Sequence, residues 1–597
     1  MLIKQLKILY NFLIARFSEL RHKHITDHQK ILLLSVVVGM LAGFGAVIIK
    51  NLVHYIRVLI EGFIKPGEDY LYILFPLVGL SITVLFIKYI NRNPVRHGIP
   101  GVLYAIGKKK GRIKTHNLYS SIISSALTVG FGGSVGLEGP AIATGAAIGS
   151  SLGKWFHLNQ KQITLLLGCA CAGAMSAIFK APIAAVIFAL EVIMLDLTMS
   201  AIVPLLISSA TGVLTSYFFM GQNYLYAFAV NDAFKLTQIG WYLIFGIFTG
   251  LCAVYFTKMY NLISEAFDKI ANVFVRLLTG GLLLGLAIFI VPSLFGEGYE
   301  VINSSLRGQY GYLFDGTFYS GLSGNFWATL FLFFILLLLK VIATSVTFGS
   351  GGVGGMFAPS LFSGAIAGLF FSQALRGGAG IDISMSNFAL TGMAGMIAAV
   401  IHAPLTAVFL IAELTGGYHL FLPLILVATT SYATARIFVS NSVYTIQLAK
   451  RGELMTHHKD KAVLMMLQLQ DLIESDFNIL RPLDTMGRLI ETIRHAHRNI
   501  FPVVEEDGTF RGLIKLDDVR HIMFDREMYQ NVYVRDLMFM PDYVILYDDS
   551  VEEVARKFQE SGRYNIAVLK HGKYLGFISR ARLFSKYRDL LKDFSEE

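Results

Sequence analysis

Residues 133–149 read Gly-Ser-Val-Gly-Leu-Glu-Gly-Pro-Ala-Ile-Ala-Thr-Gly-Ala-Ala-Ile-Gly. Nearly every side chain in this stretch is small or apolar, and Glu138 is the one acid. A carboxylate at the centre of a membrane helix costs on the order of 3 kcal/mol on insertion scales, so such groups usually face a pore or a partner and mark an ion or proton pathway. We therefore predict that Glu138 is a functional residue.

The residues around Glu138 indicate what kind of site it belongs to. Glycines allow tight turns and a close approach of ligand to backbone, and Pro140 suits the first turn of a helix. We expect a loop at 133–139 and a helix that begins inside the membrane at Pro140. Such a helix start presents unpaired N–H groups and the positive end of the helix dipole, which together favour an anion. The predicted ligand is a small anion, with which Glu138 competes.

The composition is that of a membrane protein. Of the 597 residues, 54% are hydrophobic and 15% are charged, and the mean hydropathy is +0.58. Many separate apolar runs approach the ~20 residues that a membrane helix needs, so we predict a polytopic α-helical protein in a lipid bilayer. The three cysteines, Cys169, Cys171 and Cys252, show neither metal-ligand nor disulfide spacing. No metal site is predicted.

The net charge of +10 is explained by membrane orientation, and no nucleic-acid partner is predicted. Basic residues precede the first long apolar run and lie again at 108–114, after the second run. The positive-inside rule then puts the N-terminus and 108–114 in the cytoplasm, and the predicted location is the plasma (inner) membrane. No cleavable signal peptide is expected, because the N-terminal segment lacks a short apolar core before a small-residue site.

The second half of the apolar region repeats the first. Two groups of residues recur in the same order at nearly one offset: Pro140, Gly145 and Gly149 as Pro359, Gly364 and Gly368, and Ala181-Pro182 with Glu191 as Ala403-Pro404 with Glu413. Such matches indicate a duplicated membrane unit, with the site at the interface of the copies. Glu191 and Glu413 lie inside apolar runs, where a buried acid bonds to a nearby chain, so a structural role is predicted for both. The repeats are expected at about 31–218 and 238–445.

The composition changes after Arg451-Gly452, where the apolar runs end. The tail is charged and repeats internally: Ile500-Phe501-Pro502-Val503-Val504, leading to Gly512, is echoed by Asn565-Ile566-Ala567-Val568-Leu569, leading to Gly576. We predict a soluble pair of α/β modules, with the C-terminus in the cytoplasm. The predicted organisation is a cytoplasmic N-terminal segment at 1–30, a transmembrane domain at 31–450, a linker at 451–475, and modules at 476–530 and 531–597.

Four motifs of the membrane part resemble those of the CLC family of chloride channels and proton/chloride antiporters. They are the gating-glutamate motif (Gly136-Leu137-Glu138-Gly139-Pro140), the second anion-binding helix start (Gly355-Met356-Phe357-Ala358-Pro359), the end of the first anion-binding loop (Gly98-Ile99-Pro100) and the chloride-contacting tyrosine (Tyr444). The tail resembles a pair of CBS domains. The resemblance implies the CLC fold, with two inverted helical repeats and broken helices, in a homodimer that has one anion path per subunit.

The resemblance also implies roles for individual residues. Backbone N–H groups near Met356 and Phe357 and the Tyr444 hydroxyl would hold a dehydrated chloride, and Glu138 would be a gate that responds to pH. His97 stands where the family usually has serine; an imidazole N–H still donates to an anion, but the ring is bulkier and titrates near neutral pH. The anion-binding set carried over from the family is His97, Gly98, Ile99, Gly136, Gly139, Met356, Phe357 and Tyr444.

One departure from the family bears on the mechanism. Proton-coupled members typically carry an inner glutamate immediately after the position of Glu191, and this chain has Val192 there, which cannot relay a proton. We therefore predict passive chloride transport by a voltage-gated-type channel that Glu138 gates. The alternative is a proton/chloride antiporter, since some exchangers in the family lack this residue and water can carry the proton. A more distant alternative, a CBS-bearing divalent-cation channel, would need intramembrane acidic clusters, and the membrane part has few acids.

Catalytic and nucleotide-binding motifs give little support to other functions. The sequence has no His-Glu-x-x-His zinc motif and no Gly-x-x-x-x-Gly-Lys-Ser/Thr phosphate loop, so no enzyme is predicted and no cofactor is required. The CBS resemblance implies an adenine nucleotide between the modules, at Lys515 and Asp518 in the first and at Ser579 and Arg582 in the second. Each set is only half a match to the ribose-contacting pattern. The preferred alternative is a packing and dimerisation module without ligand.

Overall fold

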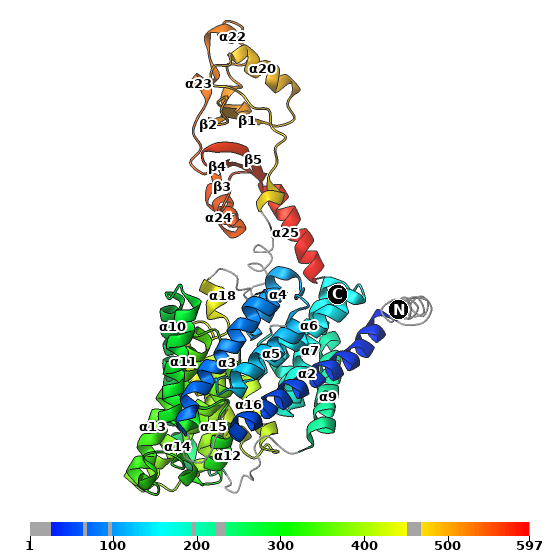
Figure 1. Ribbon diagram of the computed structural model, residues 1–597. Coiled ribbons are helices and arrows are strands. Elements are labelled where there is room, and N and C mark those ends of the chain that lie inside the picture. The colour runs from blue at the N-terminus through cyan, green and yellow to red at the C-terminus, as the bar shows by residue number, and fades with distance from the viewer. Residues whose placement is uncertain are drawn as a thin grey trace. The chain divides into compact units, whose positions relative to one another are not determined.

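The computed structural model describes residues 26–63, 69–93, 98–193, 199–222, 234–450, 467 and 469–595. Contacts divide the chain into two compact units, Met1–Leu454 and Met455–Glu597, and Figure 1 shows the elements of both. The first unit is helical, and the second mixes helices with strands. Most of the predicted N-terminal segment and much of the predicted linker lie outside the described residues.

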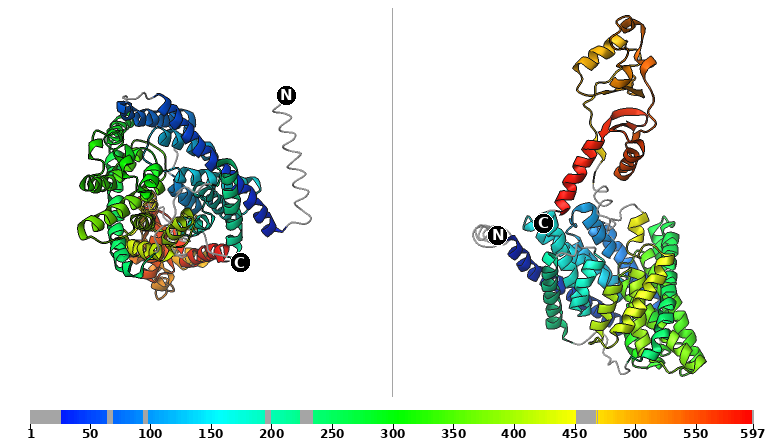
Figure 2. Two further views of the ribbon diagram at one scale, coloured as in Figure 1. Left: turned by 90° about the horizontal axis from the view of Figure 1, so that it is seen from below. Right: turned by 180° about the vertical axis from the view of Figure 1, so that it is seen from behind.

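The first unit begins with the helices of the first repeat. They are α2 (Asp27–Phe63), α3 (Leu74–Leu85), α4 (Gly98–Lys109), α5 (Asn117–Gly130), α6 (Glu138–Trp155), α7 (Gln160–Phe179), α8 (Pro182–Glu191) and α9 (Met199–Met220). The long helix α2 packs against both α7 and α9 (Figure 2). A capping box at Asn159 begins α7, because the side chains of Asn159 and Gln162 each accept the other's backbone N–H.

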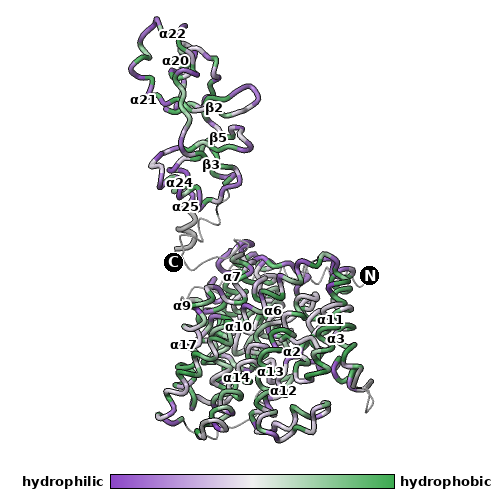
Figure 3. Tube along the Cα trace, turned by 90° about the vertical axis from the view of Figure 1, so that its left-hand side faces the viewer, coloured by the Kyte–Doolittle hydropathy of each residue, from purple (hydrophilic) through white to green (hydrophobic). Residues whose placement is uncertain are grey.

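The second repeat supplies the remaining helices of the first unit. They are α10 (Ile239–Asp268), α11 (Val273–Ile290), α12 (Tyr299–Leu306), α13 (Phe326–Gly349), α14 (Phe357–Ala379), α15 (Met385–Ile401), α16 (Pro404–Leu414), α17 (Phe421–Phe438) and α18 (Ile446–Lys450). Within the described residues, nine helical segments are long and apolar enough to cross a membrane, whereas α8, α15 and α16 are apolar but shorter. Hydrophobic residues accordingly dominate much of this unit (Figure 3).

The repeated glycines lie where helices pack closely. α6 packs against α7, and α14 packs against α15 in the second repeat. A Cβ atom at Gly145 or Gly149 would lie 2.7 or 2.6 Å from backbone oxygens of α7, and one at Gly364 or Gly368 would meet backbone oxygens of α15. Small residues let membrane helices approach to backbone contact. The glycine spacing that repeats in the sequence is therefore a packing requirement of two equivalent helix pairs.

The two short helices α8 and α16 cap each other. Glu191, the last residue of α8, accepts from the backbone N–H groups of Leu405 and Thr406 at 3.2 and 2.8 Å and from the Thr406 hydroxyl at 2.7 Å. Glu413, near the end of α16, accepts from two N–H groups in the first turn of α8 at 3.0 and 2.8 Å. Helix starts leave such donors without an intrahelical partner. Both acids make structural contacts of the kind that the sequence indicated.

The second unit contains two strand pairs of the same kind. In the first half, β1 (Ile500–Val504) pairs antiparallel with β2 (Phe510–Lys515). In the second half, β4 (Asn565–Lys570) pairs antiparallel with β5 (Lys573–Ser579), and β3 (Ile545–Leu546) joins β4 in parallel. Each antiparallel pair has one register shift. The accompanying helices are α20 (Met486–His495), α21 (Leu516–Val519), α22 (Met528–Asn531), α23 (Val534–Leu537), α24 (Val551–Ser561) and α25 (Arg580–Ser595).

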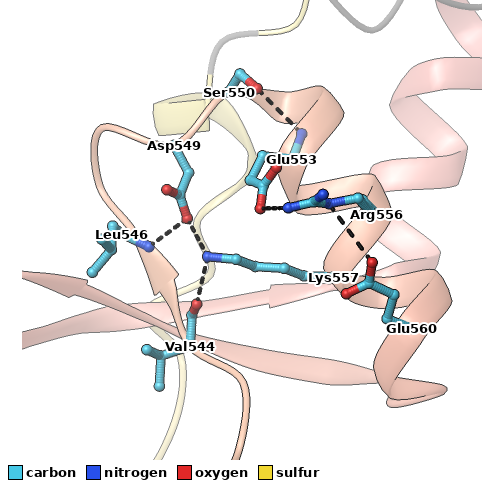
Figure 4. Close-up of polar contacts among 8 residues, drawn as sticks. All are labelled: Val544, Leu546, Asp549, Ser550, Glu553, Arg556, Lys557 and Glu560. Atoms are coloured by element: carbon cyan, nitrogen blue, oxygen red, sulfur yellow. Dashed lines mark hydrogen bonds and ion pairs between the residues drawn. The ribbon is translucent and has the colours of Figure 1, made fainter.

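An ion pair joins α24 to the residues on either side of β3 (Figure 4). The Lys557 ammonium donates to Asp549 Oδ2 at 2.6 Å and to the Val544 carbonyl at 2.9 Å. The same carboxylate oxygen accepts the Leu546 N–H at 2.8 Å, and the Ser550 hydroxyl caps α24 by accepting the Glu553 N–H. The Lys557 and Asp549 side chains are only 19% and 16% exposed. This contact therefore differs from the exposed ion pairs of the unit, which contribute little.

Candidate functional site

Two glycine-rich loops, one from each repeat, meet at the centre of the membrane unit. The Gly136 N–H donates to the Gly355 carbonyl at 2.9 Å, and the Gly355 N–H donates back at 2.7 Å. This exchange brings the starts of α6 and α14 together. The start of α4 joins them, because a Cβ atom at Gly98 would lie only 2.9 Å from the Gly139 Cα. Three helix starts thus meet in one place, and because the first N–H groups of a helix have no intrahelical partner, such a place suits an anion.

The start of α6 differs from the expected one. The helix begins at Glu138, two residues before Pro140, so the predicted loop at 133–139 is too long and is corrected to end at Leu137. The reason is that proline needs no intrahelical donor anywhere in the first turn, so Pro140 sits inside that turn without losing a bond. Glu138 is consequently a first-turn residue and is fixed to the helix start.

A small cavity of about 20 Å³ lies beside the three helix starts. Its lining comprises Gly98, Ile99, Pro100, Gly139, Tyr260, Phe348, Gly354, Gly355, Met356, Val443, Tyr444 and Gln447. A cavity needs roughly 10–15 Å³ by this measure to hold one water molecule, so this one fits a single small particle. Tyr444 is 4% exposed, and its hydroxyl makes no hydrogen bond to the described residues. A buried, unpaired donor beside helix starts matches an anionic ligand.

Glu138 lies fully buried next to this small cavity. Its Oε1 accepts a hydrogen bond of 2.5 Å from the Tyr299 hydroxyl. Its Oε2 makes no hydrogen bond to the described residues, and a Cβ atom at Gly355 would lie 3.3 Å from it. Since Gly355 also lines the small cavity, the carboxylate lies against the same helix starts that would hold an anion.

A second, larger cavity of about 390 Å³ is lined by the loop that precedes α12. Tyr299, the hydrogen-bond donor to Glu138, is part of its wall, and so is Glu297. The wall also holds the partly buried Arg57 and the exposed Glu300 and Asp315. The large cavity therefore reaches the surface of the unit, and the loop at 296–299 stands between it and Glu138.

Two lysines of the membrane helices belong to the surroundings of this loop. Lys340 on α13 is fully buried; its ammonium donates to the Gly296 carbonyl at 2.9 Å and lies 4.7 Å from the centre of the Phe362 ring. Lys50 on α2 donates to the Ile178 carbonyl at 2.6 Å. Both lysines interact electrostatically with Glu297. Intramembrane charges are costly unless they are partnered, and each of these has a partner.

The sequence analysis missed Glu297, Tyr299, Lys50 and Lys340. A signal for two of them was present, since Lys340 and Lys50 are charged residues inside long apolar helices, which is the same argument that singled out Glu138. No sequence signal ties Tyr299 to Glu138, because the two residues are 161 positions apart. Their pairing arises only from the fold.

The structure brings most of the predicted site residues together. Gly98, Ile99, Gly139, Met356 and Tyr444 line the small cavity. Gly136 forms the bridge between the loops, and Phe357 is fully buried at the start of α14. Val192 is a buried residue at the end of α8. His97 lies outside the described residues.

The positions expected to contact a nucleotide in the tail make contacts of other kinds. The Ser579 hydroxyl donates to the Glu474 carboxylate at 2.6 Å, and the same carboxylate pairs with Arg498 at 2.7 Å. The Lys515 ammonium lies over the Phe539 ring, 4.8 Å from its centre, and Asp518 is exposed. Ser579 is thus engaged within its own unit, and a nucleotide would have to displace this contact.

The chain belongs to the voltage gated chloride channel family, whose model matches residues 78–436. The CBS domain model matches residues 469–525 and 534–589. The predicted family and fold class are confirmed: a CLC-type helical membrane protein that carries a pair of CBS domains.

Three known proteins illustrate the likeness. A putative chloride channel protein ClcB-like of Ralstonia nicotianae is 30% identical over 64% of this chain and 86% of its own length. An H(+)/Cl(-) exchange transporter ClcA of Vibrio cholerae is 28% identical over 70% of this chain and 88% of its own length. The crystal structure of a slow cyanobacterial Cl-/H+ antiporter shares the fold with a TM-score of 0.58; it is 22% identical and covers 72% of this chain and 99% of its own.

Proposed function

We propose that this protein is a secondary transporter that exchanges chloride for protons, with Glu138 as the group that both ions use. The observation that carries the proposal is the position of the Glu138 carboxylate, which lies against helix starts that would hold an anion and has one oxygen without a hydrogen bond to the described residues. The curated Vibrio cholerae relative, an H(+)/Cl(-) exchange transporter, supports antiport. The alternative drawn from the sequence is therefore preferred to the channel.

The anion step follows from the small cavity. Chloride would be held by N–H groups at the starts of α6 and α14 and by the Tyr444 hydroxyl, which together replace part of its hydration shell. A carboxylate at the same helix starts competes with the anion for these donors. Protonation removes the charge of Glu138, so the neutral side chain leaves the donors to chloride. Glu138 thus couples the binding of chloride to the binding of a proton.

The proton step needs a route on each side of Glu138. On one side, Tyr299 and the large cavity adjoin the carboxylate. On the other side, Val192 occupies the position of the family's inner glutamate and offers no titratable group. Water must carry the proton along this inner leg. We expect the exchange to be slow because the inner acid is missing. Exchange should nevertheless still occur.

The remaining predictions complete the proposal. We propose that the N-terminus, the 108–114 loop and the CBS pair are cytoplasmic in a plasma (inner) membrane, so that the large cavity opens to the outside. A homodimer with one path per subunit is proposed from the family resemblance. Chloride is the proposed anion, the protein is proposed to be a transporter without enzymatic activity, and an adenine nucleotide at the CBS pair stays a prediction.

The test is chloride efflux from liposomes that contain the purified protein, with the external pH recorded and no imposed proton gradient. Proton uptake that scales with chloride release supports the antiporter. Chloride release that starts only when the membrane potential is shunted, without proton movement, would instead support the channel that Val192 favours. Empty liposomes give the background leak of both ions.

A further inference from the structure

The loop between the large cavity and Glu138 has an unusual sequence for its place. Residues 296–299 read Gly-Glu-Gly-Tyr and connect the turn Pro292–Leu294 to α12. Gly296 and Gly298 have φ angles of 59° and 86°, a backbone conformation that glycine adopts at little cost. Glu297 lies between the two glycines, beside the start of α6.

Glu297 and Tyr299 contact two consecutive residues at the start of α6. Glu297 Oε1 accepts the Leu137 N–H at 3.2 Å, and the Tyr299 hydroxyl donates to Glu138 Oε1 at 2.5 Å. Both side chains also line the large cavity of about 390 Å³. Glu297 is half-buried. A second carboxylate therefore adjoins Glu138 and reaches the cavity that Glu138, fully buried, does not line.

The charges that face Glu297 come from three helices. Lys50 of α2, Lys340 of α13 and Glu138 of α6 all interact with it electrostatically. Farther out, Arg57, Glu300 and Asp315 belong to the wall of the same cavity. Two ammonium groups thus balance two carboxylates.

We propose that Glu297 is the outer proton relay of the gate: it takes a proton from hydronium in the large cavity, which leaves water, and passes this proton to Glu138. In this step the O–H bond of the Glu297 carboxyl group breaks as an O–H bond forms on Glu138, so one proton moves and the charge of the pair is unchanged. Tyr299 is a positioning residue that restrains Glu138 by donating its hydroxyl hydrogen to Oε1. The inference rests on the proposed function, because it requires that Glu138 exchanges protons.

The test compares Glu297→Gln with the wild type in liposomes, with chloride and proton fluxes measured while only the pH on the large-cavity side is changed. Removing a well-placed acid–base group typically costs 10²–10⁴-fold in proton transfer, and since water can partly substitute, we expect proton flux to fall by about tenfold or more. The outer pH dependence should flatten. Asp315→Asn is the matched control, because Asp315 lies on the same cavity wall but is exposed, and it should leave both readouts unchanged.

A second background separates a relay from a structural role. In a Glu138→Gln protein the relay has no acceptor, so adding Glu297→Gln should change neither chloride flux nor its pH dependence. An equal effect of Glu297→Gln in both backgrounds would overturn the inference, and so would unchanged proton flux in the single variant. If the Gln variant does not fold, Glu297→Asp keeps the carboxylate but shortens its reach; proton flux should fall several-fold, and an unchanged flux would overturn the proposal.

The failure of this inference is distinguishable from the failure of the proposed function. A wild-type protein that moves chloride without protons would refute the antiporter, and Glu297 would then be judged on the outer pH dependence of chloride flux alone. A coupled wild type with a Glu297→Gln variant of the same proton flux and pH profile would refute only the relay.

Discussion

The two halves of the membrane unit meet at the candidate site, whereas the two modules of the tail meet at the turns of their strand pairs, where the Phe510 N–H donates to the Gly572 carbonyl and the Tyr574 N–H to the Gly508 carbonyl. In the membrane unit, Gly136 and Gly355 exchange backbone hydrogen bonds, and Glu191 and Glu413 cap each other's helices. The halves differ at the gate, where Phe357 holds the place in the second repeat that Glu138 holds in the first. Both repeats provide a helix start at the site. At this position, only the first repeat carries an acid.

Within each tail module, a corresponding aspartate makes a local contact. Asp484 accepts the Arg481 N–H at 2.7 Å before α20, and Asp549 accepts the Leu546 N–H at 2.8 Å before α24. Each aspartate serves its own module. In the second module, Lys557 also forms an ion pair with this aspartate. Divergence in the tail therefore changes local stability, whereas divergence in the membrane unit changes the chemistry of a shared site.

Removing the acid that distinguishes the membrane halves should have the largest effect. In Glu138→Gln we expect proton movement to be lost and chloride flux to persist without pH dependence, because the amide can neither ionise nor carry a proton. Chloride and proton fluxes in liposomes measure both. Glu191→Gln, at another acid near a helix start, should remain coupled. Coupled proton movement in Glu138→Gln would contradict the assigned gate.

The second-largest effect is expected from disrupting the backbone hydrogen bonds between Gly136 and Gly355. A Cβ atom at Gly355 would lie 2.8 Å from the Gly139 backbone nitrogen, so Gly355→Ala must separate the starts of α6 and α14. We expect a destabilisation of about 1–3 kcal/mol from overpacking and a strong loss of chloride flux. Gly321→Ala is the control, since nothing lies within 4 Å of its added methyl group. Normal flux in Gly355→Ala would show that the bridge is not needed.

Tyr444 tests the contribution of a side-chain donor to the site, because its hydroxyl lies beside the helix starts. Tyr444→Phe removes this donor, and a hydrogen bond to a charged group contributes about 1.5–3 kcal/mol. The chloride concentration for half-maximal flux should therefore rise roughly tenfold or more. Tyr260→Phe is the matched control, because Tyr260 lines the same cavity but its hydroxyl accepts a bond from Gln447. Equal shifts in both variants would contradict the role of Tyr444.

In the tail, replacing Lys557 of the second module by the threonine found at the equivalent position of the first should have a smaller effect on stability. Thr492 occupies the place in α20 that Lys557 occupies in α24. Lys557→Thr removes the bonds to Asp549 and Val544 and should cost about 1–2 kcal/mol. Hydrogen exchange of β3 and α24 in the full chain should become roughly tenfold faster. An unchanged rate there, or an equal increase at α20, would contradict a local role for the ion pair.

The smallest expected effect is a loss of local stability at low pH near Asp507. Hydrogen bonds from the backbone N–H and the hydroxyl of Thr509 lower the pKa of Asp507 in the turn between β1 and β2. A lowered pKa means that the native state binds this proton less readily, so the stabilisation is present above the ordinary aspartate pKa and is lost as the pH falls below it. Hydrogen exchange of this turn, corrected for intrinsic rates, should therefore quicken on acidification. Asp507→Asn should remove that dependence.

Much of the fold could be predicted because it rests on local rules. Apolar run lengths indicated the helices, and the repeated spacing of Gly145 and Gly149 marked helices in backbone contact. Glu138 was identified because an acid among small residues is rare in a membrane. The boundary of α6 was missed by two residues, since Pro140 fits any place in a first turn.

The rest of the site could not be predicted because it depends on long-range contacts. Tyr299 reaches Glu138 across 161 positions, and the Lys340 ammonium finds its acceptor at Gly296 through the packing of α13. Neither pairing has a spacing that a sequence pattern could reveal. The preference for an antiporter over the channel that Val192 favours comes from a similar exchange transporter, and no spacing in the sequence indicates it.

The reciprocal caps of α8 and α16 carry a consequence for how such a chain could arise. Each half lacks the acceptor for its own helix start and holds the acceptor for the other. A half expressed alone would expose unpaired donors at membrane depth, which is costly. Two identical copies, however, could close both caps by pairing with each other. The ancestor of the fused chain is therefore expected to have been an obligate dimer, and gene fusion then made its interface permanent.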